Sequence, residues 1–280
     1  MADAGTLYVV ATPIGNLGDI SRRAIEVLGS VSKIAAEDTR HSKKLMQAIG
    51  VATPLLSYHE FSGKAVATKI IAALQSGESV ALISDAGTPL ISDPGYKLVC
   101  QARALGLPII PIPGACAVTA ALSVAGLPTD KFAFEGFLPN KSAARRARLQ
   151  ALAAEPRSLV CYESPHRIVE SIGDMQQIFG PDRLIFIARE ISKKFETHFL
   201  GTSLDCLAWL QQESHQRKGE FVVIVAPCDE RELEARRLQQ AVEPVKTLRR
   251  EISMKRAVAI ASEFTGARKN QLYSAILEDP

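Results

Sequence analysis

The chain has 280 residues, of which 47% are hydrophobic and 22% charged, values typical of a globular protein with a core large enough for two domains. The formal net charge of +3 excludes a strongly basic or acidic protein; it is compatible with a nucleic-acid partner but does not establish one. No run reaches 18 apolar residues and the amino terminus carries no targeting pattern, so we expect a cytoplasmic protein with no membrane segment.

Cysteine and histidine spacing gives no sign of a metal site. The chain contains no Cys-x-x-Cys pair, and its histidines are not spaced as metal ligands from one another or from cysteine. Most of the cysteines lie in or beside apolar runs, which favours buried, reduced thiols. We therefore predict no metal. The residues concerned are Cys100, Cys116, Cys161, Cys206 and Cys228, with His41, His59, His166, His198 and His215.

The first 125 residues alternate short apolar runs with helical patterns. The predicted strands cover residues 6–11, 33–36, 55–56, 79–83 and 108–112. The first predicted helix begins near Asp19 or Ser21, either of which can cap it. The later helices are predicted at residues 41–49, 64–74, 96–105 and 115–124. This alternation predicts a mostly parallel sheet covered by helices on both faces.

The pattern changes at the break formed by residues 126–130, where we place a domain boundary. Five further strands are predicted at residues 132–134, 158–162, 184–188, 197–200 and 221–225. The strands near 185 and 198 leave no room for a helix between them, so they form a hairpin and the second sheet is mixed. The predicted fold is thus α/β with a parallel-sheet domain (1–125), a mixed-sheet domain (126–228) and a helical extension (229–280).

The loop at residues 84–95 is the most informative segment. It follows the apolar strand at 79–83 and contains Asp85 and Asp93 together with two glycines and two prolines. In open α/β sheets, ligands bind beyond the carboxyl ends of the strands, which is where this loop begins. A binding loop is therefore the favoured interpretation, and an elaborate turn is the alternative.

Three other loops of the first domain carry small or polar residues at strand ends. The loop at 12–18 lacks the G-x-G-x-x-G fingerprint, and the chain contains no phosphate-binding P-loop motif. The segment at 37–40 supplies either an acidic residue for a ribose hydroxyl or an ordinary helix N-terminus. The small residues at 113–117 let a ligand approach the backbone, although they also begin many ordinary helices.

Two loops of the second domain are also candidates. The loop at 162–167 combines Arg167 with hydrogen-bonding groups at the start of a helix, which suits an anion. Alternatively, Ser164 caps that helix, Pro165 is its first residue, and His166 and Arg167 are ordinary surface residues. The segment at 218–220 fits either a binding loop or a solvated turn.

The chain carries a family resemblance in six motifs that occur in order, at residues 7–19, 36–40, 84–95, 111–115, 134–139 and 162–167. Together they resemble the bacterial ribosomal RNA small-subunit 2′-O-methyltransferase I family, within the tetrapyrrole-methylase-like (class III) superfamily. The resemblance runs from about residue 6 to 226, and a C-terminal extension is also expected in that family. It implies S-adenosylmethionine as cofactor, in a cleft between the two α/β domains, and a homodimer.

The resemblance also implies the substrate, the ribose of a cytidine in the decoding region of the small subunit's 16S rRNA. Asp85 and the backbone after it are expected to hold the methionine end or the ribose of the cofactor, and Ala115 to Ala117 to wall its adenine. Ser84 stands where the wider superfamily has glycine. The expected cofactor-binding residues are Pro13, Gly15, Ser84, Asp85, Ala86, Gly87, Thr88, Asp93, Gly114, Ala115, Cys116 and Ala117.

The chemistry of methyl transfer suggests catalytic candidates. The sulfonium is already a good leaving group, so alignment does most of the work, and a general base adds roughly 10²–10⁴-fold. Asp38 is the first candidate for that base, followed by Glu37, His59 and Glu163. Arg40 and Arg167 are candidates for holding RNA phosphates. The predicted catalytic set is Asp38, Arg40 and Glu163.

The C-terminal extension is basic: residues 231–270 contain ten Lys or Arg and five acidic residues. Leu248, Ile252, Val258, Ala261 and Phe264 form a predicted apolar stripe, and a second helix follows the turn at 265–267. Such a unit can bind the RNA backbone, although basic runs are usually solvated helix faces. The predicted RNA-binding residues are Arg145, Arg146, Arg167, Arg249, Arg250, Lys255, Arg256, Arg268 and Lys269, with Lys141 and Arg148 beside the first of them.

Two other functions stay open at this point. One is a methyltransferase of the same superfamily that acts on a corrinoid or porphyrin precursor, whose many carboxylates would also favour basic residues. The other is a ribosome assembly factor that binds RNA without catalysing a reaction. The helical extension and the set of motifs favour the RNA methyltransferase.

Overall fold

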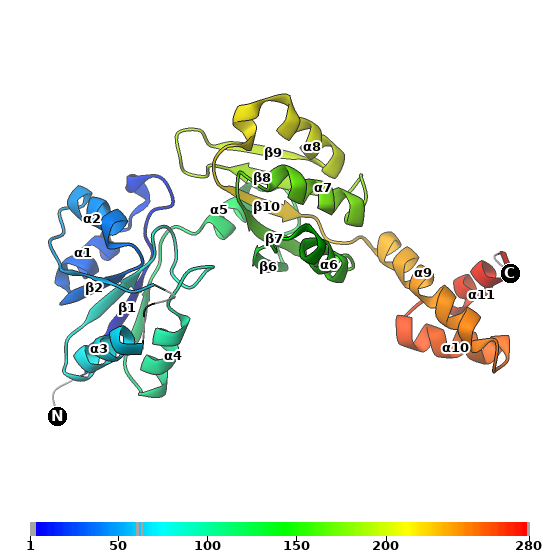
Figure 1. Ribbon diagram of the computed structural model, residues 1–280, viewed down its shortest axis with the longest axis horizontal. Helices are drawn as coiled ribbons and strands as arrows, with labels where there is room; N and C mark the ends of the chain where they lie inside the picture. The colour runs from blue at the N-terminus through cyan, green and yellow to red at the C-terminus, as the bar shows by residue number, and fades with distance from the viewer. Residues whose placement is uncertain (1–3, 60–61, 63, 279–280) are drawn as a thin grey trace.

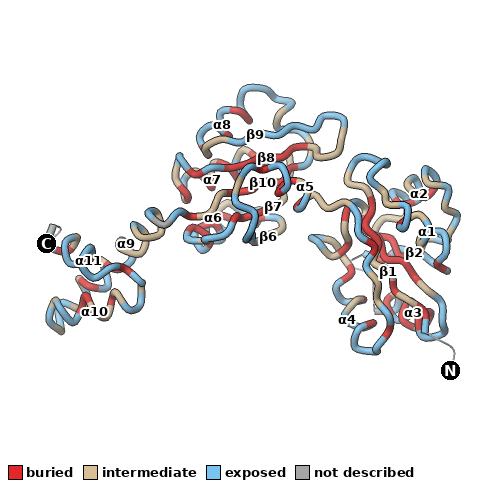
Figure 2. Tube along the Cα trace, turned by 180° about the vertical axis from the view of Figure 1, so that it is seen from behind, coloured by how far each residue is buried: buried red, intermediate tan, exposed pale blue. Residues whose placement is uncertain are grey.

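The structure is a computed structural model that describes residues 4–59, 62 and 64–278. Two α/β units stand next to each other, and three helices extend from the second unit on the side away from the first (Figure 1). This arrangement confirms the predicted fold class. The buried residues follow the central strands of both sheets, as Figure 2 shows.

The first unit contains five parallel strands in the order β3-β2-β4-β1-β5. Its strands are β1 (Leu7–Val10), β2 (Lys33–Ala36), β3 (Leu55–Ser57), β4 (Val80–Ile83) and β5 (Ile109–Ile112). The helices that cover it are α1 (Arg22–Ser30), α2 (Thr39–Ala48), α3 (Lys64–Gln75) and α4 (Tyr96–Ala104), with a 3-10 turn, η1, at Leu17–Asp19.

Both faces of this sheet are covered, as predicted. Leu28 of α1 and Met46 of α2 pack on one face, whereas Leu74 of α3 and Leu98 of α4 pack on the other. Helix α1 is capped by Ser21, whose side chain accepts from the Ala24 N–H. The parallel order brings the carboxyl ends of all five strands to one edge, and the candidate loops leave from that edge.

The second unit is a mixed sheet in the order β6-β7-β10-β8-β9. Strands β6 and β7 are parallel, the other pairs are antiparallel, and β8–β9 is the predicted hairpin. Its strands are β6 (Phe132–Phe137), β7 (Ser158–Glu163), β8 (Leu184–Arg189), β9 (Thr197–Thr202) and β10 (Phe221–Val225). Its helices are α6 (Ser142–Leu152), α7 (Ile168–Phe179) and α8 (Ser203–Gln212), with the short η2 (Ser214–Arg217).

Helix α5 (Ala117–Val124) connects the two units and packs on the second sheet. Its Val118 and Leu122 belong to the same buried cluster as Val160 of β7 and Phe186 of β8. The helix begins two residues later than predicted because Cys116 is still extended, with φ −146° and ψ 120°. The last residues before the predicted boundary at 125 therefore contribute to the core of the second unit.

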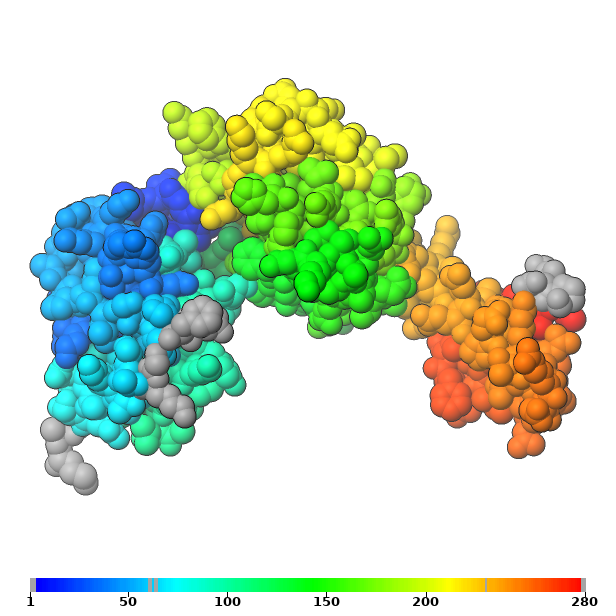
Figure 3. All heavy atoms as spheres, in the orientation of Figure 1, coloured from blue at the N-terminus to red at the C-terminus, as the bar shows by residue number. Residues whose placement is uncertain are grey.

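The last three helices form a small unit with its own core. They are α9 (Glu230–Leu248), α10 (Met254–Thr265) and α11 (Lys269–Glu278), and Val245, Val258 and Leu272 are among the residues buried between them. The predicted apolar stripe is correct except for Phe264, which is 86% exposed. Figure 3 shows this unit as a separate lobe. Arg183 anchors α9 to the second unit through an ion pair with Glu232 at 2.5 Å.

None of the helices in the described part of the chain is both long and apolar enough to span a membrane.

Candidate active site

A cavity of about 360 Å³ lies where the two α/β units meet. The first unit contributes the loop after β1, the loop after β4 and the start of α5, all at the carboxyl edge of its sheet. Their lining residues are Ile14, Ala86, Gly87, Thr88, Ile91, Ser92, Asp93, Cys116 and Ala117. The 84–95 loop thus supplies more of the lining than any other segment of that unit, as expected for a binding loop.

The second unit forms the opposite wall. Its lining residues come from the ends of β6, β7 and β8, the loop after β8, and the start of β10. They are Phe137, Tyr162, Glu163, Ser164, Pro165, Ala188, Ile191, Lys193, Glu220, Phe221 and Val222. Most of both walls is apolar, and a small number of polar groups converge on it, which is the usual composition of a small-molecule site.

Backbone hydrogen bonds hold the first-unit loops together. The Thr12 N–H donates to the Gly87 carbonyl at 2.9 Å, and the Gly87 N–H donates back to the Thr12 carbonyl at 3.1 Å. The Thr88 hydroxyl donates to the Ala115 carbonyl at 3.1 Å. Gly87 has a φ of +80°, which favours glycine. Its N–H is used inside the protein, so it lines the cavity without being a free donor for a ligand.

The predicted cofactor-binding residues divide into two groups. Half of them line the cavity, namely Ala86, Gly87, Thr88, Asp93, Cys116 and Ala117. The others lie in the surrounding loops and do not line it, namely Pro13, Gly15, Ser84, Asp85, Gly114 and Ala115. The Asp85 carboxylate instead accepts from the Asp38 N–H at 3.0 Å, which ties the loop after β4 to the loop after β2.

Asp93 is the acidic residue of this loop that lines the cavity. Burial raises the pKa of Asp93 to about 6, against the lowering effect of a hydrogen bond with Ser84, and the carboxylates of Glu37 and Asp85 raise it further. Burial, followed by the charge of Asp85, also raises the pKa of Glu37. Asp93 therefore changes its charge close to neutral pH.

Asp38 and Arg40 lie at the N-terminus of α2. Of the two interpretations of residues 37–40, this one is the ordinary helix N-terminus. Asp38 caps the helix by accepting from the Arg40 N–H at 2.8 Å, and its carboxylate pairs with the Arg40 guanidinium at 2.9 Å. The hydrogen bond from the Arg40 side chain lowers the pKa of Asp38 to about 2. Asp38 is thus a weak proton acceptor, and neither residue lines the cavity.

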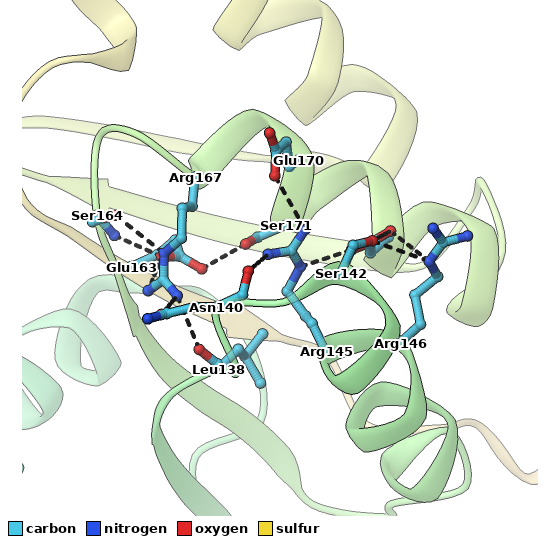
Figure 4. A network of polar contacts seen from close by, with 11 residues as sticks. Leu138, Asn140, Ser142, Arg145, Arg146, Glu163, Ser164, Arg167, Glu170 and Ser171 are labelled. Atoms are coloured by element: carbon cyan, nitrogen blue, oxygen red, sulfur yellow. Dashed lines mark hydrogen bonds and ion pairs between the residues drawn. The ribbon is translucent and has the colours of Figure 1, made fainter.

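Glu163 lies at the cavity wall, but its carboxylate is buried among donors (Figure 4). It accepts from the Ser164 N–H at 2.7 Å, from the Ser171 hydroxyl at 2.5 Å and from Arg167 at 2.7 Å. The Arg167 guanidinium also donates to the Leu138 carbonyl at 3.1 Å. Arg167 is the residue before α7 and Ser164 does not cap that helix, so the simple capping interpretation is wrong.

Arg145 belongs to the adjoining part of the same network, and its side chain is only 1% exposed. It donates to Asp174 at 2.7 Å and pairs with Glu170 at 3.4 Å. A phosphate cannot reach a guanidinium that is enclosed in this way, so the predicted RNA contact of Arg145 is wrong. Arg167 is likewise satisfied inside the protein. Arg146 is half-exposed and shares Asp174 at 3.3 Å.

Lys193 is a cavity residue that local sequence patterns do not reveal. Its ammonium pairs with Glu190 at 2.8 Å and with Glu220 at 2.9 Å. Next to it, the Ser192 hydroxyl donates to Asp19 of the first unit. The loop after β8 therefore crosses the boundary between the units, a contact between segments more than 170 residues apart in the chain.

The predicted RNA-binding residues of the C-terminal unit are all exposed. Arg268 pairs with Glu234. No ion pair among the described residues involves the other five, which are Arg249, Arg250, Lys255, Arg256 and Lys269. In the same described part of the chain, no three His, Cys, Asp or Glu side chains gather as a metal site would require.

Comparison with known proteins identifies the family. Residues 6–206 match the Tetrapyrrole (Corrin/Porphyrin) Methylases, and residues 240–279 match the RsmI C-terminal HTH domain. Ribosomal RNA small subunit methyltransferase I of Pseudomonas aeruginosa is 53% identical over 98% of both chains. The protein of that name from Escherichia coli O157:H7 is 46% identical over 98% of this chain and 95% of its own. The chain belongs to the ribosomal RNA small subunit methyltransferase I family.

Solved structures of the class III methyltransferase fold resemble this member of the methyltransferase I family. The methyltransferase CobJ aligns over 80% of this chain and 95% of its own, with a TM-score of 0.59 and 18% identity. Uroporphyrin-III C-methyl transferase from Thermus thermophilus, complexed with S-adenyl homocysteine, aligns over 79% and 96%, with a TM-score of 0.54 and 17% identity. At these identities the likeness concerns the fold.

The cofactor of this methyltransferase is S-adenosylmethionine, as predicted. The cavity fits it. A volume of about 360 Å³ lies within the usual range for sites of small organic ligands, roughly 300–1,000 Å³. Cys116 and Ala117 offer small apolar surfaces for adenine. The cofactor carries no phosphate, which agrees with a chain that has no phosphate-binding loop.

Proposed function

We propose that this chain transfers a methyl group from S-adenosylmethionine to the 2′-hydroxyl of a cytidine ribose in the decoding region of 16S rRNA. The observation that carries the proposal is the 53% identity to a ribosomal RNA small subunit methyltransferase I over 98% of both chains. The likeness includes the C-terminal helices, whereas the tetrapyrrole-type structures align with only about four fifths of this chain. The substrate places the protein in the cytoplasm, with the small ribosomal subunit as its partner.

The cavity between the two units would bring the methyl donor and the ribose into line. S-adenosylmethionine supplies an electrophilic methyl group on a sulfonium, so the ribose oxygen must approach in line with the carbon–sulfur bond. The two walls would hold the donor in the largely apolar cavity between them. The Lys193–Glu220 pair at its edge fixes the second-unit wall.

Asp93 is the proposed proton acceptor. It lines the cavity, and with a pKa of about 6 it is mostly ionised at pH 7 and still basic enough to take a proton at a carboxylate oxygen. The sequence favours Asp38 for this role, but Asp38 caps α2 outside the cavity and has a pKa of about 2. Glu163 lines the cavity, yet its carboxylate is occupied by three donors.

The C-terminal unit is the proposed RNA anchor. This unit is a lobe on the side of the second unit away from the first (Figure 3), so its exposed arginines and lysines suit contacts with the RNA backbone rather than with the reacting ribose. Helices α10 and α11 enclose the left-handed Gly266, with a φ of +73°, in the order of a helix-turn-helix. A homodimer, implied by the family resemblance, would have twice the chain mass of 30.2 kDa in light scattering.

Two observations weigh against the alternatives. The cavity retains a carboxylate with a raised pKa, which a non-catalytic assembly factor would not need. A tetrapyrrole methyltransferase would not need a basic helical unit on the side of the second unit away from the first.

The direct experiment uses small ribosomal subunits from a bacterial strain that lacks this methyltransferase. Purified protein and S-adenosylmethionine with a labelled methyl group are added, and the 16S rRNA is recovered and cleaved with alkali. A 2′-O-methyl group blocks cleavage of the next phosphodiester bond, so the proposal expects one alkali-resistant cytidine in the decoding region. Label on a base, at another site or only on a tetrapyrrole would overturn it. Cofactor binding without transfer would favour the assembly factor.

A further inference from the structure

Phe137 is an exposed aromatic residue that nevertheless lines the cavity. It is the last residue of β6, and it is 55% exposed. Ile91, from the loop after β4, also lines the cavity and is 37% exposed. The two side chains therefore give the cavity an apolar rim with one part from each α/β unit. Single exposed apolar residues are common on protein surfaces, but this pair borders the site of the reaction.

The backbone before Phe137 directs its side chain to this rim. The register of β6 against β7 shifts between Phe134 and Gly136, and Gly136 has a φ of +63°. A Cβ at Gly136 would lie 3.2 Å from the Ser92 hydroxyl oxygen, so the glycine lets the strand end approach the 84–95 loop closely. Bulges of this kind redirect a side chain and are frequent beside active sites.

One aromatic contact holds the ring of Phe137, and a second supports its partner. The centroid of Phe137 lies 5.5 Å from that of Tyr162, with the ring planes tilted by 58°. Tyr162 is supported in turn by Phe134, whose centroid lies 5.0 Å away in an edge-to-face arrangement. Burial raises the pKa of Tyr162 well above its usual range, so this supporting ring is neutral. The ring of Phe137 thus packs against Tyr162 on one side and is exposed to solvent on the other.

The proposed reaction calls for such a surface. A ribose in structured RNA is held by the stacking of its base on its neighbours, and an enzyme whose methyl donor lies in a cavity must draw the nucleotide out. Proteins that bind unstacked nucleotides usually place the base on an aromatic side chain. No other aromatic residue of the cavity lining in the described chain is as exposed as Phe137.

We propose that Phe137 is the stacking platform for the base of the nucleotide whose ribose is methylated. This inference rests on the proposed function and adds the ligand class of the rim, a base drawn out of its stack in RNA. Phe137 is a positioning residue: it holds the nucleotide, and Asp93 and the donor act on its ribose. Coverage of Phe137 by a second copy of the chain is the competing arrangement.

The test compares substitutions at the two ends of β6. Phe137→Ala removes the platform, Phe137→Trp keeps an aromatic face, and Phe132→Ala is the matched control, since Phe132 is 42% exposed and does not line the cavity. Initial rates are measured with small subunits from the strain that lacks the activity. Phe137→Ala is expected to raise the KM for subunits roughly 10- to 100-fold. Phe137→Trp and Phe132→Ala are expected to stay within about threefold of the unsubstituted protein.

Three readouts decide between the arrangements. S-adenosylmethionine affinity should change much less than the KM for subunits in Phe137→Ala, because Phe137 stands at the rim of the cavity and the platform holds RNA. An unchanged KM in Phe137→Ala, with the unsubstituted protein active, would overturn the platform alone. A change of mass in light scattering for Phe137→Ala would also overturn it, by assigning the residue to an interface between copies. If the unsubstituted protein methylates no rRNA, the proposed function fails and the platform fails with it.

A further variant covers misfolding. Should Phe137→Ala lose its folded circular-dichroism spectrum, Phe137→Leu takes its place, because it keeps apolar bulk and lacks the flat aromatic face. It is expected to raise the KM for subunits by at least tenfold, and a KM equal to that of the unsubstituted protein would overturn the platform.

Discussion

Lys193 of the second unit packs directly over Gly15 of the first. A Cβ added at Gly15 would lie 2.3 Å from the Cγ of Lys193 and 3.4 Å from the Ile191 carbonyl. The ammonium of the same lysine is fixed by Glu190 and Glu220. Gly15 therefore allows the close contact between the first unit and Lys193 of the second-unit wall, although Gly15 does not line the cavity itself.

Gly15→Ala is expected to weaken S-adenosylmethionine binding. The added methyl group would displace the aliphatic part of the Lys193 side chain, whose ammonium is held by Glu190 and Glu220. Overpacking of this kind costs about 1–3 kcal/mol, and we expect a similar loss in cofactor binding, about 10- to 100-fold in Kd by calorimetry.

Gly173→Ala is the control for that experiment. Nothing lies within 4 Å of a Cβ at Gly173 in α7, so the variant should bind the cofactor normally and be slightly more stable. Normal binding by Gly15→Ala would show that the Lys193 contact is dispensable.

The methylation rate should follow the ionisation of Asp93. The base works in its ionised form, so with a pKa of about 6 in the free protein kcat/KM should fall about tenfold from pH 7 to pH 5. Asp93→Asn should lower kcat about 10²–10⁴-fold and remove this pH dependence. The measurement is kcat/KM for small subunits between pH 5 and pH 8.

Unfolding experiments separate this role from a structural one. A carboxyl with a raised folded pKa binds more protons in the folded state, so its contribution to stability falls as the pH rises from about 4 to 6. After discounting for its partial exposure, the loss is about 1 kcal/mol. Asp93→Asn should thus be at least as stable as the unsubstituted protein at pH 7. A destabilised variant would assign Asp93 to the structure instead.

Arg145 is expected to matter for stability rather than for RNA. Arg145→Met leaves the buried carboxylate of Asp174 without its closest partner, which typically costs about 3–5 kcal/mol. Arg146→Ala removes a half-exposed pair to the same carboxylate and should cost less than about 1 kcal/mol. Urea unfolding of the two variants provides the comparison. Equal stability would mean that Asp174 does not depend on Arg145.

The salt dependence of RNA binding tests the C-terminal unit. Each phosphate contact contributes roughly 0.7–0.9 to the slope of log K against log salt. Arg249→Ala with Arg250→Ala should therefore lower the slope by about 1.4–1.8 and leave cofactor affinity unchanged. Lys43→Ala with Lys44→Ala, an exposed adjacent pair on α2, is the matched control. Equal slopes for the two double variants would contradict an RNA role for the C-terminal unit.

Much of the fold follows from local patterns. Runs such as Val80–Ile83 are buried on both faces of the sheet, so they read as parallel strands, and the short spacing between β8 and β9 permits only a hairpin. The carboxyl-edge rule then places the 84–95 loop at a ligand cavity. The parallel strands, the hairpin and the position of the loop depend only on composition and spacing, so they can be predicted from the sequence.

The remaining features depend on contacts between distant segments. Lys193 reaches the cavity because the loop after β8 meets Gly15, and nothing in either segment alone indicates that meeting. Arg145 stands in a basic helix that looks solvated, yet Asp174 of α7 makes its burial possible. Within one loop, the family resemblance favours Asp85 for the cofactor, yet Asp85 anchors the backbone and Asp93 faces the cavity, which no local pattern distinguishes.

A crystal structure with S-adenosylhomocysteine tests the central claim most directly. The account expects the ligand between the two units, with adenosine against Cys116 and Ala117 and its sulfur facing the rim formed by Ile91 and Phe137. Density for the ligand at another place, or none at a saturating concentration, would contradict it.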